Sequence, residues 1–288
     1  LDSCVAGSWI HFLALLPLMW HGCHMSSVIS VRGLEKSYRS NKAVAGIDLS
    51  IEPGEIFALL GPNGAGKTTT VEILEGFRDR DRGEVSVLDT DPGIKGEQAR
   101  KWRNRIGIVL QSTHDAGDLS VFESVAHFSK YYSNPRNIDE VINAVGLTDK
   151  SAALIRTLSG GQRRRLDVAL GIIGSPELLF LDEPTTGFDP EARRAFWSLI
   201  QDLRKSGATI LLTTHYLDEA EALADRVGVI NQGKIIEVAT PALLGGRATS
   251  LATVSWKGAN GLQSERTDNP TALIRKLADT YKDEIPEL

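Results

Sequence analysis

The chain has 288 residues, of which 42% are hydrophobic and 24% are charged, and its formal net charge is −5. This composition is typical of a globular protein with an ample core, and the length allows one or two domains. Because the charge balance is acidic, the composition gives no indication of a basic surface for nucleic acid. No nucleic-acid partner is therefore expected.

The first 24 residues differ in composition from the rest of the chain. They contain both cysteines, three of the six histidines and no lysine or arginine, and Met25 follows them. We interpret residues 1–24 as a vector-derived leader outside the fold. The alternative is a membrane or secretory segment, but it lacks a positively charged start, and its apolar run is shorter than about 18 residues. The remaining chain has no cysteine, which suits a reducing cytoplasm.

Strand-like and helix-like patterns alternate through most of the chain. Strands are expected over residues 28–31, 45–51, 56–60, 84–88, 106–110, 178–183, 208–213, 227–230, 234–238 and 249–254, and helices after residue 67, over 98–105 and 163–173, from 190 onward and over 272–281. Residues 119 to about 156 are expected to be mostly helical, with Val121, Phe122, Val125 and Phe128 at apolar positions. The alternation over 56–230 predicts an α/β fold with a mainly parallel sheet flanked by helices.

A phosphate loop interrupts this pattern between an apolar strand and a helix. Residues 61–69 read GPNGAGKTT, which matches G-x-x-x-x-G-K-[ST] in its strand–loop–helix context. The glycines leave backbone N–H groups for phosphate oxygens, Lys67 supplies a positive charge, and the Thr68 hydroxyl suits Mg²⁺. The alternative is a glycine-rich turn without a ligand. The motif predicts that a nucleoside triphosphate binds at Gly61, Pro62, Asn63, Gly64, Ala65, Gly66, Lys67, Thr68 and Thr69.

Two further motifs accompany the phosphate loop. Asp182 and Glu183 end an apolar run; alone they could equally be solvated acids, but beside a phosphate loop Asp182 is expected to hold Mg²⁺. Residues 158–162 read LSGGQ, with Ser159 and Gln162 at the spacing of a helix capping box. With this signature segment (158–162), the chain from about 28 to 239 resembles the ATP-binding cassette (ABC) ATPases.

This resemblance implies a P-loop NTPase core in an ATPase domain over 25–239. The core would carry an N-terminal antiparallel β subdomain and an inserted helical subdomain at about 112–165. Glu183 would be the general base for ATP hydrolysis, His215 would contact the γ-phosphate, and Gln111 would contact Mg²⁺ or water. Tyr38 stands where the family has an aromatic residue that stacks on adenine. Taken singly, such residues are more often ordinary loop or core side chains.

The family also encloses ATP between two cassettes, which implies a homodimer or heterodimer on ATP binding. The residues that would reach the partner's ATP in trans are Ser159, Gly160, Gly161, Gln162 and Asp189. The arginine run 163–165 is interpreted as a solvated helix face or as contacts with nearby acids, not as a nucleic-acid site.

The segment after Met25 has no apolar run long enough to cross a bilayer. This fits a subunit that joins separate membrane permease subunits on the cytoplasmic face of a bacterial cell membrane, with residues 119–132 receiving the permease. The accessory tail over 240–288 resembles those of daunorubicin-resistance-type ABC-2 exporter ATPases and is expected to be truncated at its end. We therefore predict an exporter ATPase for a drug or other amphiphile.

Other functions remain open at this point. Lipids or polysaccharides are alternative substrates. A non-transport ABC ATPase acting on ribosomes or DNA is the alternative function, although such proteins usually have two cassettes in one chain or a long coiled coil. A third alternative is a nucleotide-binding or assembly module, which the presence of Glu183 and His215 disfavours.

Overall fold

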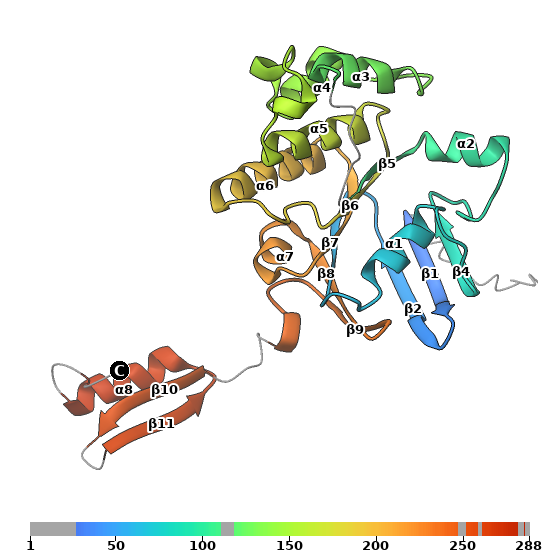
Figure 1. Cartoon of the computed structure of the whole chain (residues 1–288). Coiled ribbons are helices and arrows are strands. Elements are labelled where there is room, and N and C mark those ends of the chain that lie inside the picture. Colours follow the sequence, from blue (N-terminus) through green and yellow to red (C-terminus); the bar gives the residue numbers. More distant parts are fainter. Residues whose placement is uncertain (1–26, 111–117, 247–251, 259–260, 282–284, 286–288) are drawn as a thin grey trace, which may run out of the picture.

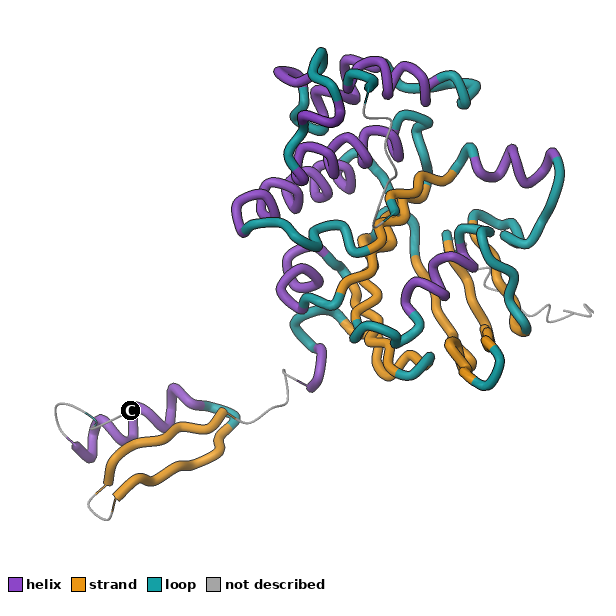
Figure 2. The backbone as a smooth tube through the Cα atoms, in the orientation of Figure 1, coloured by secondary structure: helices purple, strands orange, loops and turns teal. Residues whose placement is uncertain are grey.

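The structure, a computed structural model, describes residues 27–110, 118–246, 252–258, 261–281 and 285. Figures 1 and 2 show its helices and strands. The strands are β1 (Ile29–Tyr38), β2 (Asn41–Ile51), β3 (Ile56–Leu60), β4 (Arg82–Val87), β5 (Ile106–Val109), β6 (Leu178–Asp182), β7 (Thr209–Thr214), β8 (Arg226–Asn231), β9 (Lys234–Ala239), β10 (Ala252–Gly258) and β11 (Gly261–Thr267). The α-helices are α1 (Lys67–Leu74), α2 (Glu97–Arg103), α3 (Val121–Ser129), α4 (Ile138–Ala144), α5 (Gly160–Ile172), α6 (Pro190–Lys205), α7 (Leu217–Leu223) and α8 (Pro270–Tyr281). Within the described ranges, every helix is too short or too polar to span a bilayer.

A six-stranded sheet with the order β5-β6-β7-β3-β8-β9 forms the centre of the fold. Its first five strands are parallel and β9 is antiparallel to β8. Successive residues of β3 face opposite sides, because a strand repeats every two residues: Ile56 and Ala58 belong to one core, and Phe57 and Leu59 to another. The predicted α/β fold with a mainly parallel sheet is confirmed.

An antiparallel three-stranded sheet near the N-terminus covers one face of the central sheet. β1 lies between β2 and β4 and pairs with both. The β1–β2 hairpin turns at Arg39, whose φ is 55°. Apolar residues of this sheet, such as Ile29 and Ile47, share a core with α1 and with Phe57 of β3. The antiparallel unit therefore packs directly behind the phosphate loop and its helix.

Helices α3, α4 and α5 lie at the end of the molecule away from the N-terminal sheet (Figure 1). Val121 and Val125 of α3 are fully buried in the same core as α5 and α6. Phe122 and Phe128, which the sequence suggested as apolar positions beside these valines, are instead 40% and 39% exposed. This nine-residue helix packs only one face against the core, and the two aromatic rings lie outside that face. Residues 112–117 of the expected insertion lie outside the described residues.

Residues 252–281 form a small unit of one hairpin and one helix. β10 and β11 pair antiparallel, and α8 packs on β10. The unit has its own core, made of Val254, Trp256, Leu273 and Leu277. The sequence suggested a strand at 249–254; β10 overlaps it from Ala252 onward, residues 249–251 lie outside the described residues, and β11 was not expected. Six of the seven residues of β11 are exposed, so its sequence has no apolar alternation to indicate a strand.

Candidate nucleotide-binding and hydrolysis site

The phosphate loop joins β3 to α1, in the strand–loop–helix context that the motif requires. Gly64 and Gly66 have φ values of 78° and 106°, which residues with side chains rarely adopt. A Cβ atom at Gly66 would also lie 2.4 Å from the carbonyl oxygen of Ala43. Helix α1 begins at Lys67 with no side-chain cap and no acidic residue in its first turn. Its first N–H groups and the positive end of its dipole therefore favour an anion.

A pocket of about 420 Å³ opens at this loop. It is lined by Tyr38, Asn41, Ala43, Asn63, Gly64, Gly66, Lys67, Thr68, Thr69 and Glu183. The three other predicted loop residues support it from behind: the carbonyls of Gly61 and Pro62 accept hydrogen bonds from Lys67, and the carbonyl of Ala65 accepts one from Gly233. The pocket thus combines the loop with residues distant in sequence.

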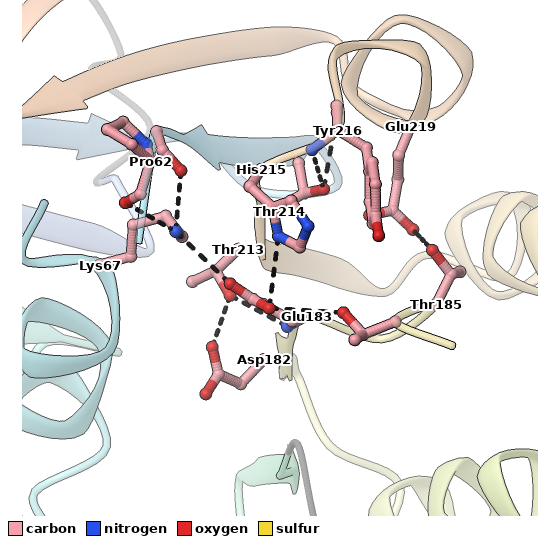
Figure 3. A network of polar contacts seen from close by, with 12 residues as sticks. Pro62, Lys67, Asp182, Glu183, Thr185, Thr213, Thr214, His215, Tyr216 and Glu219 are labelled. Atoms are coloured by element: carbon pink, nitrogen blue, oxygen red, sulfur yellow. Dashed lines mark hydrogen bonds and ion pairs between the residues drawn. The ribbon is translucent and has the colours of Figure 1, made fainter. Parts of the chain in front are cut away.

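Lys67 is buried within the loop that it belongs to, with only 4% of the residue exposed. Its Nζ atom donates hydrogen bonds to the carbonyl oxygens of Gly61 at 2.8 Å and Pro62 at 3.2 Å. The same atom lies 3.4 Å from Oε1 of Glu183 (Figure 3). A cation in this poorly hydrated place acts more strongly on a nearby phosphate than it would in water.

Glu183 directly follows β6 and is approached from two sides. Its φ is 42°, a left-handed conformation that is uncommon for a residue with a side chain. Its N–H donates to Oγ1 of Thr213 at 3.0 Å. Its Oε2 lies 3.4 Å from Nδ1 of His215, which follows β7 (Figure 3). Lys67 and His215 therefore approach the two oxygens of one carboxylate from separate segments of the chain.

Asp182, the last residue of β6, is buried beside Glu183. Burial raises the pKa of its carboxyl group, while the Thr213 hydroxyl, which donates to Oδ1 at 2.5 Å, opposes that rise. A carboxylate and the nearby hydroxyl of Thr68 are oxygen ligands of the kind that Mg²⁺ uses together with substrate phosphates. The described residues contain no cluster of three or more His, Cys, Asp or Glu that could hold a metal ion unaided. The residues thus fit an ion that is shared with the nucleotide.

Tyr38 ends β1 at the rim of the pocket and is 38% exposed. The guanidinium of Arg78 lies 5.3 Å from the centre of its ring, and the ammonium of Lys36 lies 5.8 Å from it. Arg78 also pairs with Glu72 at 2.5 Å. Cations at this distance attract the aromatic face, so these contacts hold the ring next to the pocket.

The signature segment (158–162) starts helix α5. Ser159 is the N-cap: its hydroxyl accepts the N–H of Gln162 at 3.2 Å, and the Gln162 side chain accepts the N–H of Ser159 at 3.0 Å. Gly160 is exposed, and a Cβ there would meet nothing within 4 Å, whereas one at Gly161 would meet Ala192 at 3.6 Å. The residues that line the phosphate-loop pocket do not include this segment.

Two other predicted residues lie elsewhere. Asp189 is exposed and caps α6, because its Oδ1 accepts the N–H groups of Glu191 at 2.9 Å and Ala192 at 2.8 Å. Gln111 lies outside the described residues.

Three residues of this region were not identified from the sequence. Thr213 bridges Asp182 and the N–H of Glu183. Glu219 is buried and accepts a hydrogen bond from Thr185 at 2.7 Å (Figure 3). Arg164 is 6% exposed and lies 3.9 Å from Asp167, so the solvated-face interpretation of the arginine run is wrong for this residue, and the acid-contact interpretation is correct. The partners of Thr213 and Glu219 are remote in sequence, so only the place of the threonine at a strand end could have indicated them. Asp167 lies three residues from Arg164, and the place of this arginine between apolar helix positions could have indicated its burial.

A phosphate loop, an acidic strand end beside it and a histidine after the neighbouring strand define a nucleoside triphosphatase of the P-loop class. Residues 44–186 match the family model described as ABC transporter. The Nod factor export ATP-binding protein I of Ralstonia nicotianae is 40% identical over 226 residues, covering 76% of this chain and 69% of that protein. The daunorubicin/doxorubicin resistance ATP-binding protein DrrA of Streptomyces peucetius is 41% identical over 217 residues, covering 74% of this chain and 65% of that protein.

A solved structure agrees with these relatives. The cbiO1 structure from Clostridium perfringens, described as part of the ABC transporter complex cbiONQ, is 28% identical with a TM-score of 0.70, covering 75% of this chain and 90% of that chain. The chain belongs to the ABC transporter ATPase family, and it binds and hydrolyses ATP. The family resemblance predicted from the signature segment is confirmed.

Proposed function

We propose that this chain is the ATPase subunit of an exporter, in which ATP-driven closure of two cassettes moves separate permease subunits. One observation carries the proposal: Lys67 and His215 lie 3.4 Å from the two carboxylate oxygens of Glu183. The names of the relatives, which refer to Nod factor export and daunorubicin resistance, support export of a drug or another amphiphile.

Each cassette binds ATP through its phosphate loop. The backbone N–H groups and Lys67 hold the phosphates, and Tyr38 stacks on adenine. Thr68, Asp182 and Gln111 would hold Mg²⁺, which would neutralise phosphate charge.

Glu183 acts as the general base. It takes a proton from a water molecule while the water oxygen bonds to the γ-phosphorus and the bond from that phosphorus to the ADP oxygen breaks. His215 contacts the γ-phosphate from the side of β7. Two residues that hold the carboxylate in one place favour this role, because a general base must lie within hydrogen-bonding reach of the proton that it removes.

A second cassette completes the site. Ser159, Gly160, Gly161 and Gln162 supply a helix N-terminus to the ATP of the partner, and Asp189 lines the crossing between the two. ATP then contributes contacts that exist only in the closed pair, which is how a ligand shifts such an equilibrium.

The surface that contacts the permease is proposed to lie at α3 and the residues that follow it. Phe122, Phe128 and Tyr131 expose apolar rings there, by 40%, 39% and 66%. The ring centres of Phe128 and Tyr131 are 5.9 Å apart, so these two rings form one patch. Exposed aromatic patches of this kind are typical of protein interfaces. A permease bound at this patch would hold the chain on the cytoplasmic face of the cell membrane.

Glu183→Gln tests the base assignment, because it keeps the shape of the side chain and removes its basicity. ATP turnover should fall at least about 100-fold, while ATP still binds and light scattering shows a stable dimer with ATP. Glu265→Gln on the exposed strand β11 is the control and should retain turnover. Turnover of Glu183→Gln at the wild-type rate would overturn the assignment. Isolation of the native protein with ribosomes and without a membrane protein would overturn the exporter proposal.

A further inference from the structure

Arg164 is an unusual residue in this site, because a buried guanidinium joins three segments of the backbone. Its Nε donates to the carbonyl of Pro184 at 3.0 Å, and its Nη2 donates to the carbonyl of Asp182 at 2.9 Å. Its Nη1 donates to the carbonyl of Leu110, just after β5. Arg164 belongs to α5, the helix that the signature segment starts. One side chain therefore connects this helix to β5 and to both sides of Glu183.

The position of these contacts relative to Glu183 gives them a role. Glu183 holds a φ of 42°, a sparsely populated conformation that persists only where the surroundings enforce it. The carbonyls just before and just after Glu183 both bind Arg164, and its own N–H binds Thr213. These three contacts fix the turn that presents the carboxylate.

The charge of Arg164 is also balanced within the interior. Asp167 lies 3.9 Å from Nη1. Burial lowers the pKa of the guanidinium, whereas Asp167, Asp182 and Glu219 act to raise it. A buried charge with this many acidic neighbours is expensive to remove alone, because its partners would stay buried and unpaired.

We propose that Arg164 is a positioning residue that couples the orientation of the signature helix α5 to the position of the general base Glu183. Closure of two cassettes on ATP would rotate α5. The planar guanidinium of Arg164 would transmit this rotation to the turn around Glu183 through its N–H donors. The proposal rests on the proposed role of Glu183. It concerns the rate of hydrolysis and not the binding of ATP, because Arg164 is not among the residues that line the pocket.

The test compares Arg164→Lys with Arg163→Lys. Arg163 is the neighbouring residue on α5, and its side chain donates to the carbonyl of Ile155. Lysine keeps the charge but cannot direct donors to three fixed carbonyls at once. Arg164→Lys should lower kcat by about 10- to 100-fold, in line with small misplacement of a catalytic group. Its dissociation constant for ATP, measured by calorimetry, should stay within threefold, and Arg163→Lys should retain the wild-type kcat.

A second variant covers the case in which Arg164→Lys does not fold. Arg164→Gln combined with Asp167→Asn removes the guanidinium together with the carboxylate that pairs with it, and it should show the same selective loss of kcat. A kcat within threefold of wild type in a folded Arg164 variant would overturn the proposal. So would equal losses of kcat and ATP affinity, which a merely structural role predicts. Wild-type turnover in Glu183→Gln would instead refute the role of Glu183 as the general base. This result distinguishes a failure of the proposed function from a failure of the proposal about Arg164.

Discussion

The ammonium of Lys67 lies 3.4 Å from a carboxylate oxygen of Glu183, and the two side chains are only 4% and 11% exposed. Lys67 belongs to the phosphate loop, whereas Glu183 follows a strand more than a hundred residues later in the chain. The proposed phosphate ligand and the proposed base thus form one buried ion pair. Loss of either member removes the charge that balances the other in a poorly hydrated place.

Replacing Lys67 by alanine should weaken ATP binding by a factor of about 30 or more, because the phosphates of ATP lose a buried positive charge, and truncating one member of such a binding pair costs roughly 2–5 kcal/mol. Calorimetric titration with ATP measures this loss. Lys205→Ala is the matched control, since Lys205 is an exposed lysine that pairs with Asp202 on its own helix. An affinity of Lys67→Ala within threefold of wild type would contradict the expectation.

Thr213→Val removes one hydroxyl and preserves the shape of a completely buried side chain. Asp182 loses a donor at 2.5 Å, and the N–H of Glu183 loses its acceptor at 3.0 Å. Leaving buried polar groups unsatisfied costs about 1–3 kcal/mol, which urea unfolding should detect. Thr186→Val removes an exposed hydroxyl that lies 3.3 Å from Glu183 and should leave the unfolding midpoint unchanged. Equal midpoints for both variants would refute the role of Thr213.

Glu75, at the end of α1, should make stability depend on pH. Burial, with the negative charges of Asp182 and Glu72, raises its pKa from 4.5 to about 8. Between these values the folded protein binds more protons than the unfolded chain, so this group lowers stability as pH rises from about 4.5 to 8. A difference of one pKa unit between folded and unfolded states corresponds to about 1.4 kcal/mol.

Glu75→Gln has the same shape and does not titrate. Its melting temperature should exceed that of wild type at pH 8, and the difference should shrink toward pH 5. Thermal unfolding in EDTA without nucleotide measures both curves. A gap that is constant with pH would show that Glu75 does not titrate in this range.

Two capping boxes in the chain allow a comparison between stability and ATP-driven dimerisation. Ser120 caps α3 through Glu123 as Ser159 caps α5 through Gln162. Alanine at either serine should cost about 1 kcal/mol of stability, because a helix N–H loses its acceptor. If Ser159 also binds the partner's ATP, only Ser159→Ala should reduce the ATP-induced dimer measured by light scattering. Equal dimerisation of the two variants would argue against the role in trans.

The features that were predictable from the sequence are encoded over short distances. The phosphate loop needs nine consecutive residues, and the Ser159 cap needs a partner only three residues away. The hairpin of β8 and β9 follows from two apolar strands around Asn231-Gln232-Gly233. The alternating strands and helices were enough to predict the parallel sheet, because the period of two or 3.6 residues is a local property.

The features that could not be predicted depend on contacts between distant segments. Arg164 binds carbonyls 18, 20 and 54 residues away, so its run of three arginines looked like a charged surface. Glu75 stands two residues before Phe77, which is 78% exposed, and nothing local indicates that the carboxyl is buried. The exposure of Phe122 depends on which face of α3 packs against the core. Packing, not local pattern, decides each of these outcomes.

The central strands divide their residues between two separate cores, and this has a consequence for how the protein can diverge. In β6, Leu179 and Leu181 face the helical side, whereas Leu178 and Phe180 face the side of the phosphate loop. A substitution at Leu179 or Leu181 therefore alters the packing of the helical core, whereas one at Leu178 or Phe180 alters the core behind the phosphate loop. The two sides of this strand can thus change independently of each other.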